Sequence, residues 1–130
     1  MREILFRGQW IKNSEWIEGY YVFMNGTHYI IEAGSEDWGD NGEWFQVSPK
    51  SIGQYTGLKD KNGKKIFEGD IVTFPWYTDE IVKMYIAFSE GEFRATPKEI
   101  TKDVWDIRIV HSNEKFEIIG NIKDNLYLMD

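Results

Sequence analysis

Apolar and polar residues alternate with a period of two along much of this chain, the pattern of a β-strand with one buried face. The clearest stretch lies in the second half, where Val82, Met84, Ile86 and Phe88 alternate with Lys83, Tyr85 and Ala87. The short apolar runs of the first half lack the stripe of period 3.6 that marks an amphipathic helix. The pattern therefore predicts a mainly β protein.

The first 57 residues predict a β-meander with aromatic-rich strands. Asn25-Gly26 stands between the runs Tyr20–Phe23 and His28–Glu32, and such a pair between β-prone runs is a strong hairpin signal. A polar, glycine-rich loop is expected at residues 33–43. The strand that follows it, Trp44–Val47, ends before a proline, which cannot donate to a sheet ladder.

Five strands are predicted after Gly69, near residues 70–75, 80–88, 92–96, 105–110 and 116–122, the number found in a small SH3-like barrel. Gly120 marks a candidate β-bulge in the last strand. The run Thr96-Pro97-Lys98-Glu99 matches a helix capping box with proline at the first helical position. We therefore expect one short helix at residues 96–104 and no other.

The densest turn chemistry lies between the two halves. Asp60, Asn62 and Gly63 separate two apolar flanks, and these residue types favour a tight reversal, because Asp bonds nearby amides while Asn and Gly tolerate positive φ. A hairpin with its tip at residues 60–63 is therefore predicted. Gly69 then permits a sharp turn, which Asp70 can cap before the next strand begins.

Four lysines surround this hairpin tip: Lys59, Lys61, Lys64 and Lys65. A solvated tip whose charges discourage edge pairing explains them, and a finger that contacts phosphates is the functional alternative. A phosphate-binding P-loop is excluded. That loop needs four residues between its glycines and Ser or Thr after the lysine, whereas five residues separate Gly57 from Gly63 and a second lysine follows.

Composition and charge narrow the function classes. The chain has 130 residues and no cysteine, which excludes disulfides and thiolate metal sites and suits a reducing cytoplasm. Its start is charged too soon for a signal peptide, and no apolar run approaches the about 18 residues of a membrane helix, so we expect a soluble, cytoplasmic protein without membrane contact. The net charge of −7 opposes non-specific binding to duplex DNA.

The two halves differ in charge. Residues 1–57 carry four Lys or Arg against eight Asp or Glu, whereas residues 58–130 carry eleven against fourteen. Any contact with nucleic acid is therefore expected in the second half, where the charges are more mixed.

Candidate catalytic and metal-binding residues are few. The two histidines, His28 and His111, lack the spacing of a metal site, and no nucleophile elbow marks a Ser-His-Asp triad. Glu68 and Asp70 could form a carboxylate pair of the glycosidase type, but a turn cap and a solvated acid explain them more simply. The acidic loop at residues 33–43 fails the spacing of an EF-hand. We therefore expect no enzyme activity, no cofactor and no metal.

A family resemblance rests on the central stretch at residues 53–72, GQYTGLKDKNGKKIFEGDIV. This stretch resembles the signature of the YopX family, small proteins of phages and prophages. The opening MREILFRG, the segment EWIEG at residues 15–19 and the closing EIIGNI at residues 117–122 are also similar, so the resemblance covers nearly the whole chain.

The resemblance implies a two-part β-rich fold. Residues 1–57 would form an aromatic-rich N-terminal subdomain that mediates dimerisation, and residues 58–130 the central hairpin and a C-terminal SH3-like barrel. It implies no reaction and supplies no catalytic residues.

Aromatic residues in the first half exceed what a small meander can bury within itself. They either pack in a core between the two subdomains or meet another copy of the chain. We therefore expect a non-enzymatic, self-associating module that binds an unknown phage or host macromolecule in the host cytoplasm. The alternative is nucleic-acid binding through the barrel. It would use the lysines of the hairpin tip with Lys83, Arg94 or Arg108, and Trp76 and Tyr77 for stacking.

Overall fold

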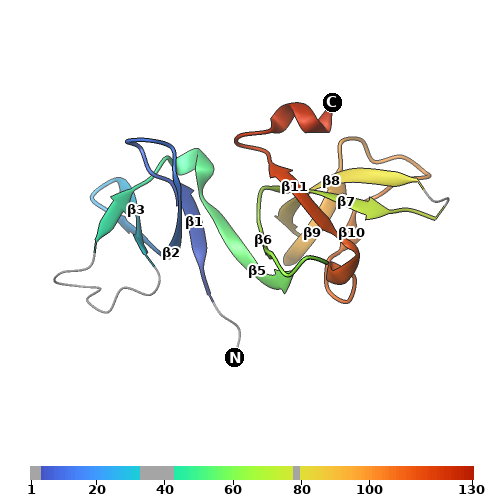
Figure 1. Cartoon of the computed structure of the whole chain (residues 1–130), viewed down its shortest axis with the longest axis horizontal. Coiled ribbons are helices and arrows are strands. Elements are labelled where there is room, and N and C mark those ends of the chain that lie inside the picture. The colour runs from blue at the N-terminus through green and yellow to red at the C-terminus, as the bar shows by residue number, and fades with distance from the viewer. Residues whose placement is uncertain (1–3, 33–42, 78–79) are drawn as a thin grey trace. The chain divides into compact units, whose positions relative to one another are not determined.

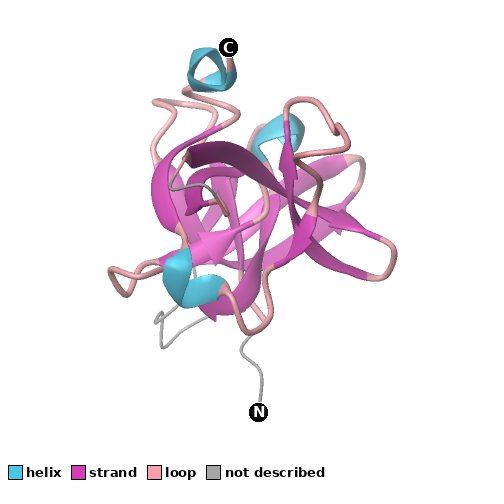
Figure 2. Cartoon of the chain, turned by 90° about the vertical axis from the view of Figure 1, so that its right-hand side faces the viewer, coloured by secondary structure: helices cyan, strands magenta, loops and turns pink. Residues whose placement is uncertain are grey.

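The regular secondary structure of the chain is almost all β-strand in the computed structural model, which describes residues 4–32, 43–77 and 80–130 (Figure 1). The strands form antiparallel sheets, and helical structure in the described residues is limited to three short 3-10 turns (Figure 2). The mainly β fold class predicted from the sequence is confirmed. The predicted loop at residues 33–43, apart from Glu43, lies outside the described residues.

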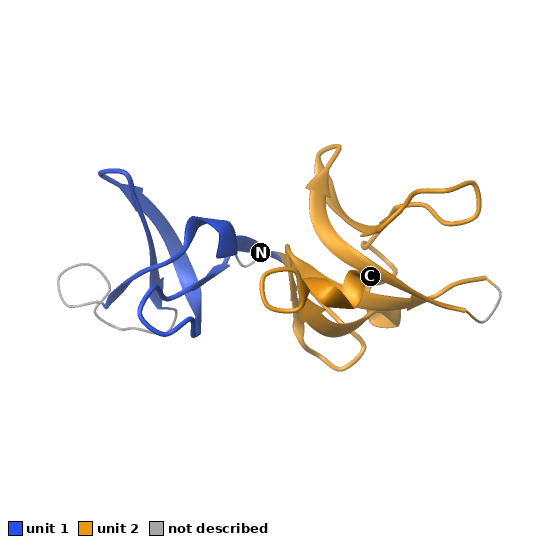
Figure 3. Ribbon diagram, turned by 90° about the horizontal axis from the view of Figure 1, so that it is seen from above, with its two compact units in different colours: residues 1–55 blue, residues 56–130 orange. Residues whose placement is uncertain are grey.

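The chain divides into two compact units, Met1–Tyr55 and Thr56–Asp130, called unit 1 and unit 2 (Figure 3). Unit 1 is a four-stranded meander of β1 (Phe6–Gln9), β2 (Trp16–Met24), β3 (Thr27–Glu32) and β4 (Trp44–Gln46). A 3-10 turn, η1 (Pro49–Ser51), leads to β5 (Gly53–Lys59), whose first residues pair with β1. Asn25 and Gly26 join β2 to β3 with φ angles of 51° and 77°, as a two-residue hairpin requires.

Main-chain contacts close the meander of unit 1 on itself. Three of them join the end of β1 to the end of β4: the bridge between Trp10 and Val47, the Ile11 amide donating to the Gln46 carbonyl at 3.0 Å, and the Ser48 amide donating to the Gln9 carbonyl at 2.9 Å. Gly8 lies at this closure, where an added Cβ would come within 2.9 Å of the Val47 side chain. The core of unit 1 consists of Ile17, Ile30, Phe45 and Val47.

Unit 2 begins with the hairpin formed by the end of β5 and β6 (Lys65–Phe67). Five strands follow: β7 (Asp70–Pro75), β8 (Ile81–Ser89), β9 (Glu92–Pro97), β10 (Ile107–Arg108) and β11 (Glu117–Asn121). Their order in the sheet is β10-β9-β8-β7-β11. The sequence predicts all five strands, although β10 is shorter than expected. The arrangement is barrel-like, and its SH3-like assignment stays a prediction.

The core of unit 2 is larger than that of unit 1. It gathers Ile66, Val72, Met84, Ile86, Ala95, Ile109 and Phe116, with Trp76 and Phe93 at its margin. The register between β7 and β11 shifts between Ile118 and Gly120, which confirms the predicted bulge. Two 3-10 turns complete the unit, η2 (Asn113–Lys115) before β11 and η3 (Leu126–Met129) after it.

The helix predicted at residues 96–104 is wrong. β9 continues through Pro97, which ends the strand where its missing N–H costs no ladder bond. The chain then makes a local turn, in which the Thr101 hydroxyl accepts the amides of Asp103 at 3.1 Å and Val104 at 3.0 Å. Ile100 is exposed rather than part of a buried helical face. Side-chain-to-backbone bonds of this kind compete with helix formation, and here they prevail.

The two units share one strand order. In each, four strands form a meander, a 3-10 turn follows the fourth, and the fifth strand pairs with the first. A serine precedes the 3-10 turn in both units, Ser48 in unit 1 and Ser112 in unit 2. A tryptophan follows the first strand in both: Trp10 donates its amide to the Glu15 carbonyl at 2.9 Å, and Trp76 to the Glu80 carbonyl at 2.7 Å. In unit 1, main-chain hydrogen bonds connect the ends of the first and fourth strands, so unit 1 serves as the closed reference for unit 2.

Candidate binding site

The lysine-bearing hairpin of unit 2 is held by Asp60, whose side chain is buried at 4% exposure. Its Oδ1 atom accepts the amides of Asn62 and Lys64, both at 2.9 Å, and so closes the tip. Its Oδ2 atom accepts the Ile118 amide of β11 at 3.0 Å. Gly63, with a φ of 79°, completes the reversal. One carboxylate thus shapes the hairpin and attaches it to the barrel.

The electrostatics of Asp60 fit this role. Burial works to raise the pKa of the carboxyl, but the backbone amides of Ile118, Lys64 and Asn62 and the charge of Lys64 outweigh it, so the pKa lies below its ordinary value. Asp60 is therefore ionised at neutral pH and acts as an acceptor for all three amides. This is a structural carboxylate rather than an acid or base.

Further bonds attach the hairpin to η2 and to the start of β11. The Asn113 side-chain amide donates to the Lys59 carbonyl at 2.8 Å, and the Lys61 amide donates to the Phe116 carbonyl at 2.9 Å. The Lys61 ammonium pairs with Glu117 at 2.9 Å. The ammonium groups of Lys59 and Lys64 extend from exposed positions on a fixed backbone.

Asp70 also has a structural position. Its Oδ2 atom accepts the Phe67 amide at 2.7 Å, and the residue is almost fully buried. Gly69 precedes it with a φ of 93° and donates its amide to the Ile86 carbonyl at 2.8 Å. Glu68, in contrast, is only partly buried. The two carboxylates thus occupy different environments, as expected for a turn cap and a partly solvated acid.

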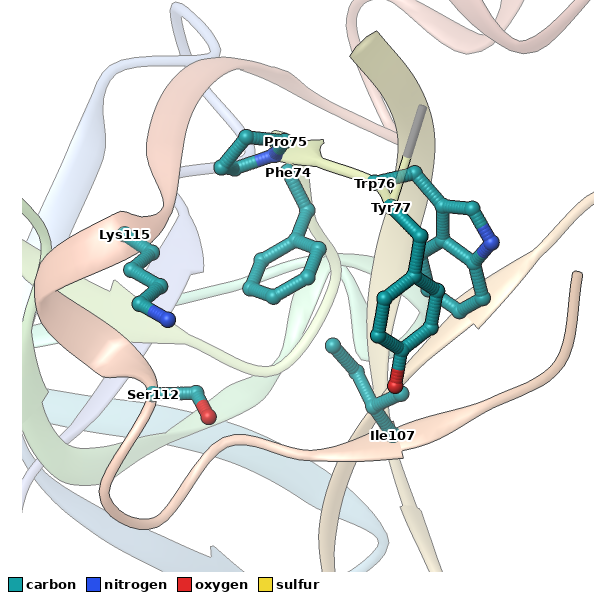
Figure 4. Close-up of a pocket in the computed structure, with 7 residues that line it drawn as sticks. All are labelled: Phe74, Pro75, Trp76, Tyr77, Ile107, Ser112 and Lys115. Carbon is teal, nitrogen blue, oxygen red and sulfur yellow. The ribbon is translucent and has the colours of Figure 1, made fainter. Parts of the chain in front are cut away.

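A depression of about 350 Å³ opens on unit 2 (Figure 4). Its lining comes from the end of β7, from β10 and from η2 with its preceding serine: Phe74, Pro75, Trp76, Tyr77, Ile107, Ser112 and Lys115. In this view the Trp76 and Tyr77 rings lie on one side, the Lys115 ammonium and the Ser112 hydroxyl lie on the other, and the Phe74 ring lies between them. The depression therefore combines aromatic faces with a cation and a hydroxyl.

Two of the lining rings, Trp76 and Tyr77, form a cluster with a third ring, Trp105, that lies outside the lining. Trp76 is 9% exposed, and its indole N–H donates to the Asp103 carbonyl at 2.9 Å. It meets Tyr77 and Trp105 edge-on, with ring centroids 5.4 and 5.2 Å away. Tyr77 is 83% exposed and Trp105 40% exposed. Trp76 thus supports the cluster, and the other two rings present it to solvent.

Comparison with unit 1 explains why the depression is open. In unit 1, Ser48 directly follows the buried Val47, and its amide bonds to the end of β1. In unit 2, Val110 and His111 separate the buried Ile109 from Ser112. His111 has a φ of 69°, and the Ser112 amide bonds back to the Ile109 carbonyl at 3.0 Å. In the part of the chain that the structure describes, no bridge joins Trp76 to Ile109, so the seam that unit 1 closes is open in unit 2.

The structure brings some of the predicted site residues together. Trp76 and Tyr77 lie together at the depression, and the hairpin of Lys59, Lys61, Lys64 and Lys65 is attached to η2, which lines it. Phe74, Trp105, Ser112 and Lys115 were not predicted, because their place depends on how distant strands meet. The sequence signal at these positions is only an aromatic residue, a serine or a lysine close to a predicted strand end.

The two arginines considered for nucleic-acid contact are paired within the barrel. Arg94 contacts Asp106 at 2.8 Å, Glu92 at 3.5 Å and Glu90 at 3.6 Å. Arg108 contacts Glu92 at 2.7 Å. Both guanidinium groups therefore face carboxylates of their own chain.

The two histidines are not among the described residues that line the depression, and the same part of the chain forms no metal-ligand group and no membrane helix. The Tyr21 hydroxyl and the His28 Nδ1 atom are hydrogen-bonded at 2.6 Å, and His111 lies in the turn before η2. Among the described residues, no three His, Cys, Asp or Glu side chains are grouped to hold a metal ion. No helix within residues 4–32, 43–77 and 80–130 is long and apolar enough to cross a membrane.

Comparisons with known proteins give a family and a similar fold. The family model described as YopX protein matches residues 5–130. The crystal structure of protein EF1440 from Enterococcus faecalis is similar over 100% of both chains, with a TM-score of 0.59 and 23% sequence identity. At that identity the likeness shows the fold alone. No curated protein matches the chain.

Proposed function

The chain belongs to the YopX protein family, and from this premise we propose that it is a phage or prophage accessory protein that binds a macromolecular partner and catalyses no reaction. The depression of unit 2 is the proposed contact site for the partner. Unit 1 is the proposed site of self-association. The host cytoplasm is the proposed location.

The observation that carries the binding proposal is the open seam with its exposed rings. Tyr77 and Trp105 are exposed, so the chain does not gain the free energy of burying these two large aromatic side chains. Exposed aromatic residues of this kind commonly act as anchors in protein interfaces. The described lining residues include no carboxylate and no histidine, which favours a contact surface over a paired acid and base.

The self-association proposal rests on the exposed part of the unit 1 sheet face that lies opposite the core cluster, a face on which Ile31 is itself buried. Ile30 and Phe45 belong to the core cluster, so their neighbours Ile31 and Trp44 lie on the opposite face, beside Tyr20 in the strand register. Tyr20 and Met24 on this face are exposed. A second copy presenting the same aromatic-rich face would bury these side chains at low conformational cost.

Sedimentation velocity at high micromolar concentration tests self-association. We expect a dimer or larger species, and we expect Tyr20→Glu with Met24→Glu to convert it to monomer. Tyr127→Glu, which changes an exposed tyrosine of unit 2, serves as the control and should leave the distribution unchanged. A wild-type protein that remains monomeric throughout would remove this part of the proposal.

Affinity capture from induced or infected cells tests partner binding. We expect wild-type protein to retain a partner that Tyr77→Ala and Lys115→Glu both lose and Tyr127→Ala keeps. A partner that binds all four proteins equally would place the contact elsewhere on the chain and contradict the assignment to the depression.

A further inference from the structure

We propose that the depression of unit 2 binds single-stranded nucleic acid, with a base on the exposed rings and the adjoining phosphates on Lys115 and the hairpin lysines. This inference rests on the proposed function, since it names the partner class for the same site. It commits to an unpaired strand, because a base inside a duplex does not offer its face to a side chain.

The rings are arranged for stacking on one side only. The Tyr77 and Trp105 rings are tilted by 37° with centroids 6.3 Å apart, and each makes a T-shaped contact with the buried Trp76. The Trp76 N–H donates to the Asp103 carbonyl, which holds that indole in place, and the exposed Tyr77 ring beside it is accessible to a base. Stacking of this kind tolerates any sequence, since every base has a flat face.

The groups opposite the rings suit a phosphate. Lys115 brings a positive charge and Ser112 a hydroxyl to the same opening (Figure 4). The bond from Asn113 to the Lys59 carbonyl fixes the hairpin backbone to the turn that carries Lys115. A strand leaving the rings past η2 therefore meets Lys115 first and the hairpin lysines next.

The positive charge of unit 2 is concentrated at this place. Residues 59–65 and 113–117 together carry five lysines against three acids, while the rest of residues 58–130 carries six Lys or Arg against eleven acids. Asp60, one of the three acids, is buried and its carboxylate is taken up by backbone amides. Charges farther away than about 10 Å are largely screened at 0.1 M salt, so the lysines of the hairpin and η2 can attract a phosphate despite the net charge of −7 and despite Asp103 and Asp106 beside the rings.

Fluorescence anisotropy with a labelled twelve-residue oligothymidylate tests this proposal, with the same-length duplex for comparison. We expect saturable binding to the single strand at 50 mM salt and much weaker binding to the duplex. If three phosphates are contacted, raising the salt to 200 mM should weaken binding about 20-fold. Absence of binding to the single strand at 50 mM salt, or equal binding to the duplex, would overturn the inference.

Two variants and two matched controls locate the contact. Tyr77→Ala should weaken binding at least about fivefold by removing a stacked ring. Lys115→Glu should weaken binding of the oligonucleotide. It should also reduce the slope of log K against log salt concentration by the amount expected for about one phosphate contact. Tyr127→Ala and Lys123→Glu change exposed residues of the same types near η3 and should leave binding unchanged. Equal losses in all four variants, or none in the first two, would refute the assignment.

A second arm separates this inference from the proposed function. A random peptide library is selected on wild-type protein and counter-selected on the folded Tyr77→Ala variant. Peptides that need Tyr77, together with no binding of oligothymidylate, would overturn the nucleic-acid inference and support a protein partner at the same site. Failure of both arms would contradict the binding site itself.

Discussion

Replacing Asp60 by asparagine tests whether one buried carboxylate holds the lysine-bearing hairpin on the barrel. The asparagine oxygen can still accept the amides of Asn62 and Lys64, but its amino group then faces the Ile118 amide, donor against donor. The hydrogen bonds from the Asn62 and Lys64 amides then go to a neutral acceptor instead of a charged one, which costs about 1 kcal/mol for each bond. The Ile118 amide loses its acceptor altogether, which costs about 1–3 kcal/mol. The expected loss of unfolding free energy is therefore about 3–5 kcal/mol.

A loss of this size is large for a unit of this length. Domains of 60–100 residues shift their melting temperature by about 4–8 °C per kcal/mol, so the melting temperature of unit 2 should fall by more than about 10 °C. Hydrogen exchange followed by mass spectrometry gives the local measurement, with protection lost first at the hairpin tip and at Ile118. Glu114→Gln on the neighbouring turn is the control, because this exposed carboxylate should change stability by less than about 0.5 kcal/mol.

The pH dependence gives an independent check of the Asp60 argument. The pKa of Asp60 is lower in the folded protein than in the unfolded chain, so the folded state binds fewer protons and its stability falls with acid. The contribution is complete above the unfolded pKa of about 3.9 and is lost as the pH falls through the folded value. The stability gap between wild type and Asp60→Asn should therefore be constant from pH 5 to 8 and shrink below pH 4. A gap under about 0.5 kcal/mol at pH 7, with unchanged exchange at Ile118, would refute the reasoning.

Four further changes probe the packing of the two units and the open seam of unit 2. Gly8→Ala places a Cβ within 2.9 Å of Val47, so thermal unfolding of unit 1 should show a loss of about 1–3 kcal/mol. Arg94→Gln leaves three carboxylates without their partly buried cation and should cost about 1–2 kcal/mol in denaturant unfolding, whereas Arg108→Gln, at an exposed pair, should cost less than about 1 kcal/mol. Deleting Val110 and His111 places Ser112 directly after Ile109, as Ser48 follows Val47, and should abolish partner binding while the β circular dichroism spectrum persists. Retained binding by that folded deletion variant would contradict the role given to the open seam.

Local chemistry made the strands and the tight turns predictable. The alternation around Met84 gives β8, Asn25-Gly26 gives the hairpin between β2 and β3, and the bulge at Gly120 follows from a glycine inside a strand pattern. Each of these features depends on residues close together in the sequence. The helix expected after Thr96 rested on a local capping pattern. The same residues also suit the end of a strand followed by a turn at Thr101, and this second structure is the one that forms.

The candidate site depends instead on distant contacts. Nothing near Lys115 in the sequence shows that it faces the rings that follow β7, some forty residues earlier. The role of Asp60 shows the same limit, since the turn it makes with Asn62 is local but its bond to Ile118 spans 58 residues. Sequence patterns therefore predict the hydrogen bonds between residues close together in the chain. They do not predict which distant residue the same side chain will contact.

The shared strand order of the two units shows how a small local difference produces the candidate site. In both, a buried aliphatic residue after the fourth strand and a serine before the 3-10 turn occupy matching places. Where the two are adjacent, the serine amide reaches the first strand and the seam closes. Where two residues intervene, one of them with positive φ, the chain bonds back on itself and the first strand ends beside an unfilled depression. The same fold thus yields a closed unit and an open one, and the rings and lysine that border the opening mark where chemistry can act.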